Sequence, residues 1–339
     1  MSAQVNPAPI PPPMAPSAVP HSLTEDAFLG GRLRILQPEK GYRAGIDAVF
    51  LAAAIPCAAG ETIFEAGIGT GVAALCAIVR NPSIHVTGIE IASRYAMLCE
   101  ENAKRNGFGH SVHVIHADVK DALRKDLSHL PQHGTFSHAI ANPPYFDEGK
   151  STPSPNILKA QAHAFGPEDL ELWIKVMYTM VALRGTVTIV HRAETLGKIL
   201  TAMDGRFGDI RIAPLYAREG TAASRVVVQG IKGSKAPMQL LPGLILHSEQ
   251  SQFTADAEAV LRDGMIFRLD DDSWLLYATG KRGGLRYDPL RRRPGRNRCH
   301  PRQSAGPGPR ARIRNSWKSS AHGSRSCAVP PSRACLPRR

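Results

Sequence analysis

The stretch ETIFEAGIGTGVAALCAIV, residues 61–79, decides the fold of this chain. Thr62–Ala66 is a short β-type run, and Val72–Val79 is an apolar helical segment. Between them, glycines occupy positions 67, 69 and 71. Glycine lets a backbone turn tightly and approach a ligand without obstruction by a Cβ atom. A strand, a glycine corner and a helix in this order predict a ligand-binding loop at the end of the strand.

The spacing within this loop distinguishes two kinds of ligand. A dinucleotide fingerprint, G-x-G-x-x-G, needs its third glycine at position 72, where this chain has Val72. The observed pattern is E-x-G-x-G-x-G, with Glu65 two positions before Gly67. S-adenosylmethionine carries a cationic sulfonium and an ammonium and has no pyrophosphate, so an acidic residue suits it and would repel a dinucleotide. The loop therefore favours S-adenosylmethionine as the cofactor.

Strands and helices alternate along the chain on both sides of the loop. Strands that alternate with helices of roughly 10–15 residues are typical of βαβ units and predict a doubly wound, mostly parallel sheet. The expected strands are 62–66, 84–89, 112–116, 136–141, 185–190 and 225–231, and the expected helices are 46–55, 72–79, 93–106, 167–183 and 193–203.

Two further acidic residues follow expected strands. Glu90 ends the strand after the loop, where a carboxylate can accept both hydroxyls of an adenosine ribose. Asp118 comes just past the next strand and is placed to accept from an adenine amino group. One such acid alone is usually a solvated loop residue. Three acids at successive strand ends indicate a site, because ligands of open α/β sheets bind at the carboxyl ends of strands.

The turn Asn142-Pro143-Pro144-Tyr145 comes directly after the strand 136–141 and is the most specific pattern in the chain. Two prolines remove two N–H donors and fix φ, so the strand stops and the turn is stiff. The Asn142 amide carbonyl and a backbone carbonyl can then accept from an exocyclic NH2, whose lone pair attacks the methyl group. The Tyr145 ring offers a flat face for stacking. An ordinary Pro-Pro turn is the alternative, which the preceding glycine loop and acidic strand ends disfavour.

With these features, the chain resembles the class I methyltransferases, in the amino-methylating branch that carries the Asn-Pro-Pro-Tyr motif. Within that branch, residues 28–264 resemble the bacterial tRNA1(Val) adenine-N6 methyltransferases, which modify the adenine 3′ of the anticodon. The resemblance also rests on the segments 41–53, 88–90 and 151–155. It implies a Rossmann-like α/β fold, with a mostly parallel seven-stranded sheet and helices on both faces.

The resemblance further implies the roles of individual residues. S-adenosylmethionine is the implied cofactor, and no metal is implied. The early segment is implied to pack beside the methionine end of the cofactor, through Arg43 and Asp47. The other implied cofactor contacts are Glu65, Gly67, Gly69, Gly71, Glu90, Asp118 and Asn142. The implied catalytic corner, which holds the acceptor, is Asn142, Pro143, Pro144 and Tyr145.

The formal net charge of +13 is concentrated at one end of the chain. Residues 265–339 carry a net charge of +14, whereas residues 1–264 carry −1, so the charge of the main domain gives no argument for RNA binding. Residues 1–22 include seven prolines and are expected to form a flexible leader. We expect one methyltransferase domain over residues 23–264 and a disordered basic tail over residues 265–339.

Two interpretations of the basic tail remain. It is either an arm that grips RNA or the product of reading a GC-rich gene in a shifted frame, whose codons give Arg, Pro, Gly, Ser, Ala and Cys. The tail has few aliphatic residues and no periodicity, which favours the shifted frame. Resequencing the 3′ end of the gene distinguishes the two.

Composition gives an expectation for the compartment. The chain has no stretch of 18 uncharged apolar residues, and no Lys or Arg precedes Arg32. A secretory signal or a mitochondrial transit peptide needs such basic residues, so we expect a soluble cytoplasmic protein. The six cysteines form no C-x-x-C pair, and Cys57, Cys76 and Cys99 lie in apolar contexts typical of free thiols.

The leading functional hypothesis is transfer of a methyl group from S-adenosylmethionine to N6 of an adenine in tRNA. An anticodon-loop base is single-stranded and can be splayed into a pocket at modest cost. Residues 147–165 are expected to form a substrate loop, with Lys150, Lys159 and His163 as candidate phosphate contacts.

Three alternatives remain open. A protein glutamine N5-methyltransferase acting on release factors could use the same turn on a side-chain amide, although such enzymes generally have a large N-terminal recognition domain and only residues 23–45 stand there. Another rRNA or tRNA amino-methyltransferase fits the motif equally. A non-catalytic RNA-binding module with a decayed site is the third, against which the intact turn argues. A DNA methyltransferase would need a separate base-recognition domain, for which no insertion is large enough.

Overall fold

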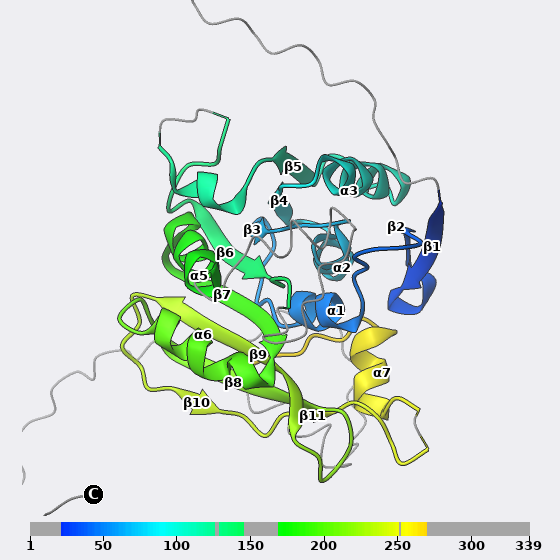
Figure 1. Cartoon of the computed structure of the whole chain (residues 1–339), viewed down its shortest axis with the longest axis vertical. Helices are drawn as coiled ribbons and strands as arrows, with labels where there is room; N and C mark the ends of the chain where they lie inside the picture. The colour runs from blue at the N-terminus through cyan, green and yellow to red at the C-terminus, as the bar shows by residue number, and fades with distance from the viewer. Residues whose placement is uncertain (1–21, 126–128, 146–168, 251, 270–339) are drawn as a thin grey trace, which may run out of the picture. The chain divides into compact units, whose positions relative to one another are not determined.

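The computed structural model of the chain describes residues 22–125, 129–145, 169–250 and 252–269 (Figure 1). These residues form one large mixed sheet and a separate two-stranded hairpin. In spatial order, the large sheet consists of β5 (Val112–His116), β4 (His85–Glu90), β3 (Thr62–Ala66), β6 (Phe136–Ala141), β7 (Val181–Arg192), β9 (Ala223–Lys232) and β8 (Phe207–Tyr216), with the two-residue strands β10 (Gln239–Leu240) and β11 (Leu244–Ile245) paired to β8.

Parallel pairing gives this sheet one edge where the functional residues collect. The neighbours β5, β4, β3, β6 and β7 are all parallel, so their C-terminal ends share one edge. β9 is antiparallel to β7 and therefore begins at that same edge. The predicted seven-stranded, mostly parallel sheet is confirmed in its seven longer strands, and β10 and β11 add two short ones.

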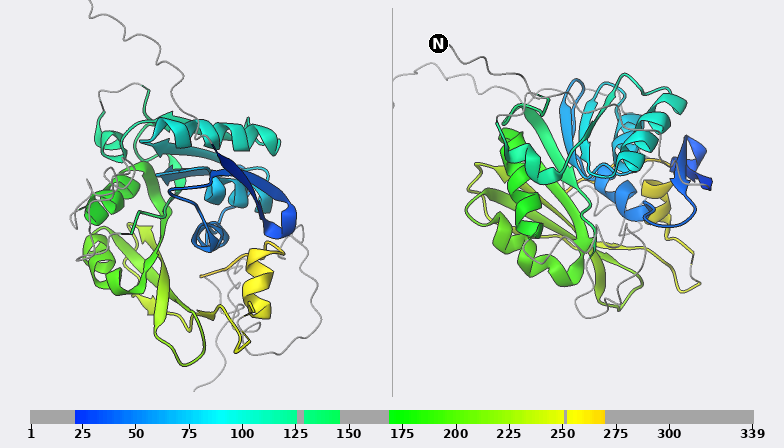
Figure 2. Two further views of the ribbon diagram at one scale, coloured as in Figure 1. Left: turned by 45° about the vertical axis from the view of Figure 1, so that its right-hand side comes forward. Right: turned by 45° about the horizontal axis from the view of Figure 1, so that its top comes forward.

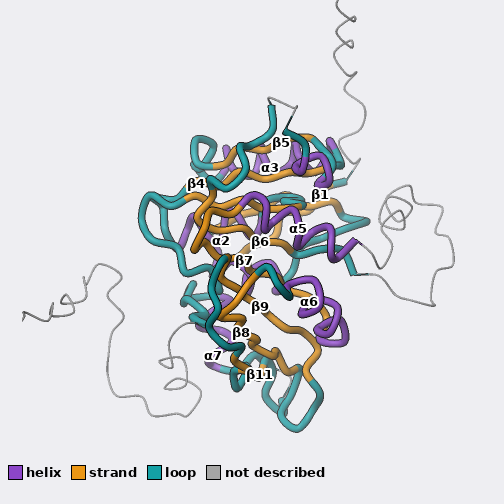
Figure 3. The backbone as a smooth tube through the Cα atoms, turned by 90° about the vertical axis from the view of Figure 1, so that its left-hand side faces the viewer, coloured by secondary structure: helices purple, strands orange, loops and turns teal. Residues whose placement is uncertain are grey.

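Helices cover both faces of the sheet (Figure 2), and each face has its own apolar core. Figure 3 shows α5 and α6 side by side on one of these faces. One face carries α1 (Ile46–Ala53), α2 (Val72–Arg80), α3 (Ser93–Arg105) and α7 (Ala255–Leu261), and the other carries α5 (Asp169–Met180), α6 (Leu196–Met203) and the 3-10 helix η2 (Val119–Leu123).

The central strand β3 shows why the sheet is covered on both sides. Its consecutive residues Ile63 and Phe64 are both fully buried, but they belong to different cores. Successive side chains of a strand point to opposite faces, so a strand without alternation needs a helical layer on each face.

An N-terminal hairpin, which the sequence did not predict, packs beside α3. β1 (Leu23–Phe28) and β2 (Leu33–Pro38) pair antiparallel around the 3-10 helix η1 (Leu29–Gly31). The fully buried Asn102 of α3 exchanges two hydrogen bonds with the backbone of Leu36, and also donates to Thr70 O at 3.0 Å. One buried amide therefore fastens the hairpin to the glycine loop.

Two predicted boundaries are wrong. The expected helix over 167–183 ends at Met180, because Val181 already pairs with Phe136 in the sheet and Arg184 has a φ of 70° that no helix allows. The domain does not end at Gly264. Phe267 is 4 % exposed, donates its N–H to Ala53 O at 2.8 Å and contacts Phe50, so apolar residues counted with the basic tail belong to the core.

The strand β8 and the helix α7 were also missed. β8 contains Pro214 and polar residues at Asp209 and Arg211, so it has no continuous β-type run. Its antiparallel pairing with β9, which continues on both sides of an irregularity between Gly208 and Arg211, supplies the stability that its own sequence lacks.

Candidate active site

The glycine loop joins β3 to α2 at the C-terminal edge of the sheet. Gly67 and Gly71 have φ of 66° and 86°. A Cβ atom at Gly67 would lie 2.5 Å from the Trp173 ring of α5, and one at Gly71 would lie 2.6 Å from Cys99 Sγ of α3. These two positions therefore require glycine because helices from both faces of the sheet press against the loop.

Gly69 is different, because the nearest atom to a Cβ there is in the Tyr42 ring at 3.3 Å. Its φ is 58°, and its N–H donates to Glu90 Oε2 at 3.0 Å. The other Glu90 oxygen accepts from the Ala92 N–H at 2.8 Å. Burial raises the pKa of Glu90, and these two backbone bonds oppose that rise. Glu90 thus fastens the loop to the end of β4, and its contact with ribose hydroxyls stays a prediction.

Glu65 is the buried acid at the end of β3. It is 3 % exposed, and its Oε2 has no hydrogen-bond partner among the described residues. Burial raises the pKa of Glu65 well above its usual range, a hydrogen bond from the Ala74 backbone opposes this, and the charge of Glu90 adds to it. A buried carboxylate with an unused oxygen is incomplete. The predicted cationic cofactor fits it, because a sulfonium or ammonium would supply the missing opposite charge.

Asp118, the third predicted acid, follows β5 and begins η2. Its Oδ1 accepts from the Lys120 N–H at 3.0 Å, and its Oδ2 pairs with Lys120 Nζ at 2.8 Å. The structure therefore shows Asp118 as a helix cap. Its contact with an adenine amino group stays a prediction.

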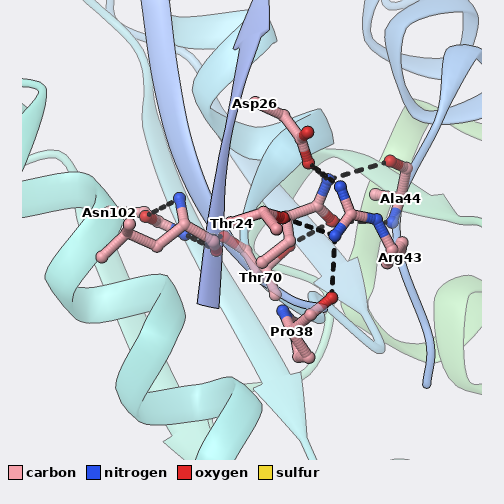
Figure 4. Close-up of polar contacts among 9 residues, drawn as sticks. Thr24, Asp26, Pro38, Arg43, Ala44, Thr70 and Asn102 are labelled. Carbon is pink, nitrogen blue, oxygen red and sulfur yellow. Dashed lines mark hydrogen bonds and ion pairs between the residues drawn. The ribbon is translucent and has the colours of Figure 1, made fainter. Parts of the chain in front are cut away.

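Arg43 lies between the hairpin and α1. Its guanidinium donates to Thr24 Oγ1 and to Pro38 O, and it forms an ion pair with Asp26 (Figure 4). All three partners belong to the hairpin, so the Arg43 side chain points toward the hairpin. The cofactor contact expected of it stays a prediction.

The proline corner follows β6 at the same edge of the sheet. Tyr145 Oη lies 2.7 Å from Asp47 Oδ2 and 3.1 Å from Asn142 Oδ1. Arg225 Nε donates to the same Asp47 oxygen at 3.1 Å. Asp47 lies in the first turn of α1 and Arg225 lies near the start of β9, so the corner is tied to two elements far away in the sequence. Asp47 was predicted beside the cofactor, and the structure bonds it to the acceptor corner.

The ring of Tyr145 already has neighbours. His191 packs edge to face at 4.9 Å between ring centroids, and the guanidinium of Arg225 lies 4.8 Å from the ring centroid, with that of Arg192 at 5.7 Å. The pKa of His191 is lowered to about 4, mainly by burial and further by the positive charges of Arg192 and Arg225. His191 is therefore neutral at physiological pH, and two cations flank the ring that was predicted as an apolar platform.

Sequence reasoning missed four residues of this site: Tyr42, Trp173, His191 and Arg225. Tyr42 stands directly before Arg43, and its contact with the loop depends on how the chain turns between β2 and α1. Arg225 and His191 come together because β9 pairs antiparallel with β7, a long-range pairing that no local pattern encodes. Only Trp173 had a usable signal, since a large aromatic in a predicted core helix invites packing on a glycine.

Other predictions fall outside the part of the chain that the structure describes. The candidate phosphate contacts Lys150, Lys159 and His163, the segment 151–155, the leader 1–21 and the tail from residue 270 lie there. Within the described ranges, no three His, Cys, Asp or Glu side chains group as a metal site, and none of the helices is long and apolar enough to cross a membrane.

The fold and the site together define a class. Residues 44–176 match the family model described as the methyltransferase small domain. This range contains the glycine loop, the three acids Glu65, Glu90 and Asp118, and the proline corner. A solved structure described as a predicted O-methyltransferase from Agrobacterium tumefaciens is 25 % identical, with a TM-score of 0.55 over 66 % of this chain and all of that one. The described residues have the fold of the class I methyltransferases, which use S-adenosylmethionine as cofactor, and residues 44–176 match a methyltransferase family, as the resemblance predicted.

Curated relatives give a narrower likeness. A tRNA1(Val) (adenine(37)-N6)-methyltransferase of Shewanella baltica is 22 % identical over 241 residues, which cover 70 % of this chain and 98 % of that protein. The protein of the same name from a Flavobacteriaceae bacterium is 31 % identical over 120 residues, 35 % of this chain and 48 % of its own length. The one from Actinobacillus succinogenes is 23 % identical and is covered over 96 % of its length.

Proposed function

We propose that the chain transfers a methyl group from S-adenosylmethionine to N6 of an adenine in tRNA, with adenine 37 of a valine tRNA as the first candidate. The observation that carries the proposal is the corner Asn142–Tyr145 at the strand edge that also holds the glycine loop. The names of the curated relatives support tRNA as the substrate.

In this proposal, the cofactor lies along the acidic strand ends. Glu65, whose Oε2 lacks a partner among the described residues, faces the cationic methionine part, Glu90 faces the ribose, and Asp118 faces the adenine. The cofactor supplies an electrophilic methyl group. The loop glycines Gly67, Gly69 and Gly71 keep the backbone close to it, and Arg43 borders the methionine end, whereas Asp47 stands at the proline corner.

The acceptor amine is held at the proline corner. The Asn142 carbonyl and a backbone carbonyl of the turn accept its two hydrogens and leave the nitrogen lone pair aimed at the methyl group. The prolines Pro143 and Pro144 keep those acceptors fixed, so the reaction depends on positioning and on exclusion of water. No strong base is needed, because the proton leaves after the C–N bond forms.

An oxygen acceptor is a second candidate, because the solved neighbour from Agrobacterium tumefaciens is described as a predicted O-methyltransferase. A hydroxyl must lose its proton in order to attack, which requires a base with a pKa near the working pH. The imidazole in contact with Tyr145 is His191, whose pKa of about 4 makes it a weak base. This contact favours an amine acceptor over a hydroxyl.

The direct test uses the full chain with isotopically labelled S-adenosylmethionine, unmodified bulk tRNA and release factors, followed by mass spectrometry of nucleosides and peptides. We expect N6-methyladenosine in tRNA. Methylated glutamine without methylated adenine would overturn the proposal in favour of a protein substrate, and cofactor binding without any product would favour a decayed site.

A further inference from the structure

Four side chains at the proline corner form one continuous chain of polar contacts. Arg225 Nε donates to Asp47 Oδ2 at 3.1 Å, Tyr145 Oη lies 2.7 Å from the same oxygen, and Asn142 Oδ1 lies 3.1 Å from Tyr145 Oη. The side chains of Asp47 and Arg225 are 17 % and 28 % exposed, so this ion pair is largely shielded from water. The order of the chain is Arg225, Asp47, Tyr145, Asn142.

The phenol at the centre of this chain has one proton and two oxygen neighbours. A tyrosine hydroxyl donates once, so Tyr145 cannot donate to both Asp47 and Asn142. Asp47 is ion-paired with Arg225 and its contact is the shorter one. A hydrogen bond to a charged acceptor is also about twice as strong as one to a neutral acceptor. The Tyr145 proton therefore points to Asp47.

The phenol also keeps that proton. Burial raises the pKa of Tyr145 well above its usual value, and the negative charge of Asp47 adds to the rise. The imidazole of His191 is a poor competitor for it, because burial lowers the pKa of that ring to about 4 and makes it a weak base, and its Nδ1 contacts Thr195 Oγ1 at 2.7 Å.

The direction of the phenol proton decides how Asn142 must stand. With its proton turned to Asp47, Tyr145 Oη presents only lone pairs to Asn142. A carbonyl oxygen 3.1 Å away would be repelled, whereas an NH2 group in the same place would donate a hydrogen bond. The structure has the carbonyl end of Asn142 toward the phenol. The two ends of a carboxamide have nearly the same shape and exchange by a half-turn of the terminal torsion, so the reversed amide fits the same place.

We propose that Asp47 is a positioning residue that acts through Tyr145, setting Asn142 with its NH2 toward the phenol and its carbonyl oxygen toward the acceptor amine. This inference rests on the proposed function, in which that carbonyl accepts a hydrogen from the amine. An Asn142 free to rotate would present NH2 to an NH2 for part of the time, and two donors cannot bond. Arg225 contributes by holding the Asp47 carboxylate in place through their ion pair.

The orientation can be measured without any enzyme activity. In the full chain labelled with 15N-asparagine, the Asn142 side-chain NH2 signals are identified by their loss in Asn142→Ala. We expect nuclear Overhauser contacts from these NH2 protons to the Tyr145 ring protons ortho to the hydroxyl. In Asp47→Asn these contacts should weaken. An Asn142 amide whose NH2 points away from Tyr145 in the unsubstituted chain would overturn the proposal.

Kinetics test the consequence for methyl transfer. Asp47→Asn and Tyr145→Phe should each lower kcat roughly tenfold, as expected for one charge-assisted hydrogen bond lost from the transition state. The KM for tRNA and the Kd for S-adenosylmethionine should stay within about twofold. Because both substitutions interrupt the same series of polar contacts, kcat of the double variant should fall no further than in the more affected single variant.

The matched control is Asp209→Asn. It breaks the Asp209–Arg211 ion pair, whose side chains are similarly shielded at 15 % and 16 % exposure but lie on β8, and it should leave kcat unchanged. Asp47→Ala, checked for folding by circular dichroism, serves as a second variant. Additive losses in the double variant, or wild-type kcat in both Asp47 variants, would overturn the proposal that Asp47 orients Asn142 through Tyr145. If the unsubstituted chain methylates none of the acceptors, the proposed function fails. The nuclear Overhauser measurement of the Asn142 amide still decides whether Asp47 orients that amide through Tyr145.

Discussion

The two halves of the functional edge are built in opposite ways. In the acidic half, at the ends of β3 and β4, Glu65 is buried with an oxygen that lacks a partner among the described residues. In the corner half, between α1, β6 and β9, Asp47, Tyr145 and Arg225 satisfy one another. A buried charge without a partner costs stability, whereas a paired one holds its neighbours in place.

This difference shows how one edge can serve two ligands. The acidic half stays incomplete until a cation arrives, so part of its electrostatic stabilisation is available only to the cofactor. The corner half is complete beforehand, so an acceptor meets groups that are already oriented, and little reorganisation is needed when it binds.

The largest expected effect separates the halves directly. Asn142→Ala should lower kcat about 100-fold, the order of loss seen when one preorganised polar group is removed from a reacting centre. The Kd for S-adenosylmethionine, measured by calorimetry, should change by less than about threefold. Asn81→Ala, which removes an amide that donates to Cys57 O near the start of β3, serves as the control. Equal losses of kcat and cofactor affinity would mean that Asn142 belongs to the cofactor half.

Two glycines of the loop in the acidic half should respond differently to substitution by alanine. Gly67→Ala should destabilise the fold by about 3 kcal/mol, because it combines a left-handed φ with a collision against Trp173. Gly69→Ala has the φ cost, about 1–2 kcal/mol, with a much milder contact at 3.3 Å from the Tyr42 ring, and should instead weaken cofactor binding. Urea unfolding of both variants provides the measurement. Equal free energies of unfolding would contradict the assignment of Gly67 to helix packing.

Glu65 should make cofactor binding depend on pH. Its pKa is raised by burial in the free protein, and a nearby cation stabilises the ionised form, so binding releases a proton. Affinity should therefore rise with pH, by up to about tenfold per unit below the raised pKa, and level off above it. Calorimetry in two buffers of different ionisation enthalpy counts the proton. In Glu65→Gln the slope should vanish, and a slope that persists would place the titrating group elsewhere.

The smallest expected effect concerns the corner half at mild acidity. His191 has its pKa lowered to about 4 in the folded chain, against about 6.5 unfolded, so between these values the unfolded state binds the extra proton. Stability should then fall as pH drops from about 6.5 toward 4, by roughly 1 kcal/mol at pH 5.5. His191→Gln should remove this part of the acid sensitivity in urea unfolding curves. An unchanged pH dependence would show that His191 titrates normally.

Much of the edge could be predicted because parallel strands bring their ends together. Glu65 lies in the last two residues of an expected strand, Glu90 and Asn142 each follow one directly, and the structure puts those strand ends at one edge. The helix expected over 167–183 was predicted too long, because Val181 already pairs in the sheet and the helix ends at Met180. β8 was missed because its stability comes from pairing with β9. Local patterns report what a segment prefers and give no measure of what its neighbours add.

The hydrogen-bond partners of Arg43 and Asp47 could not be predicted from local sequence. Arg43 and Asp47 stand four positions apart and were expected together at the cofactor, yet one turns to the hairpin and the other bonds Tyr145, 98 residues later. The direction in which each side chain leaves the segment depends on where the hairpin and β9 pack, and neither contact has a local signature.

The sequence by itself determined the chemistry available at the strand ends: acids where a cation can bind, glycines where φ must be positive, and a stiff turn that carries an amide. Only the tertiary structure decided which of these groups are paired and which are left open. Glu65 Oε2 lacks a partner among the described residues, whereas Asp47 Oδ2 bonds both Tyr145 and Arg225. Hydrogen bonds and ion pairs act over a few ångströms, and long-range packing sets those distances.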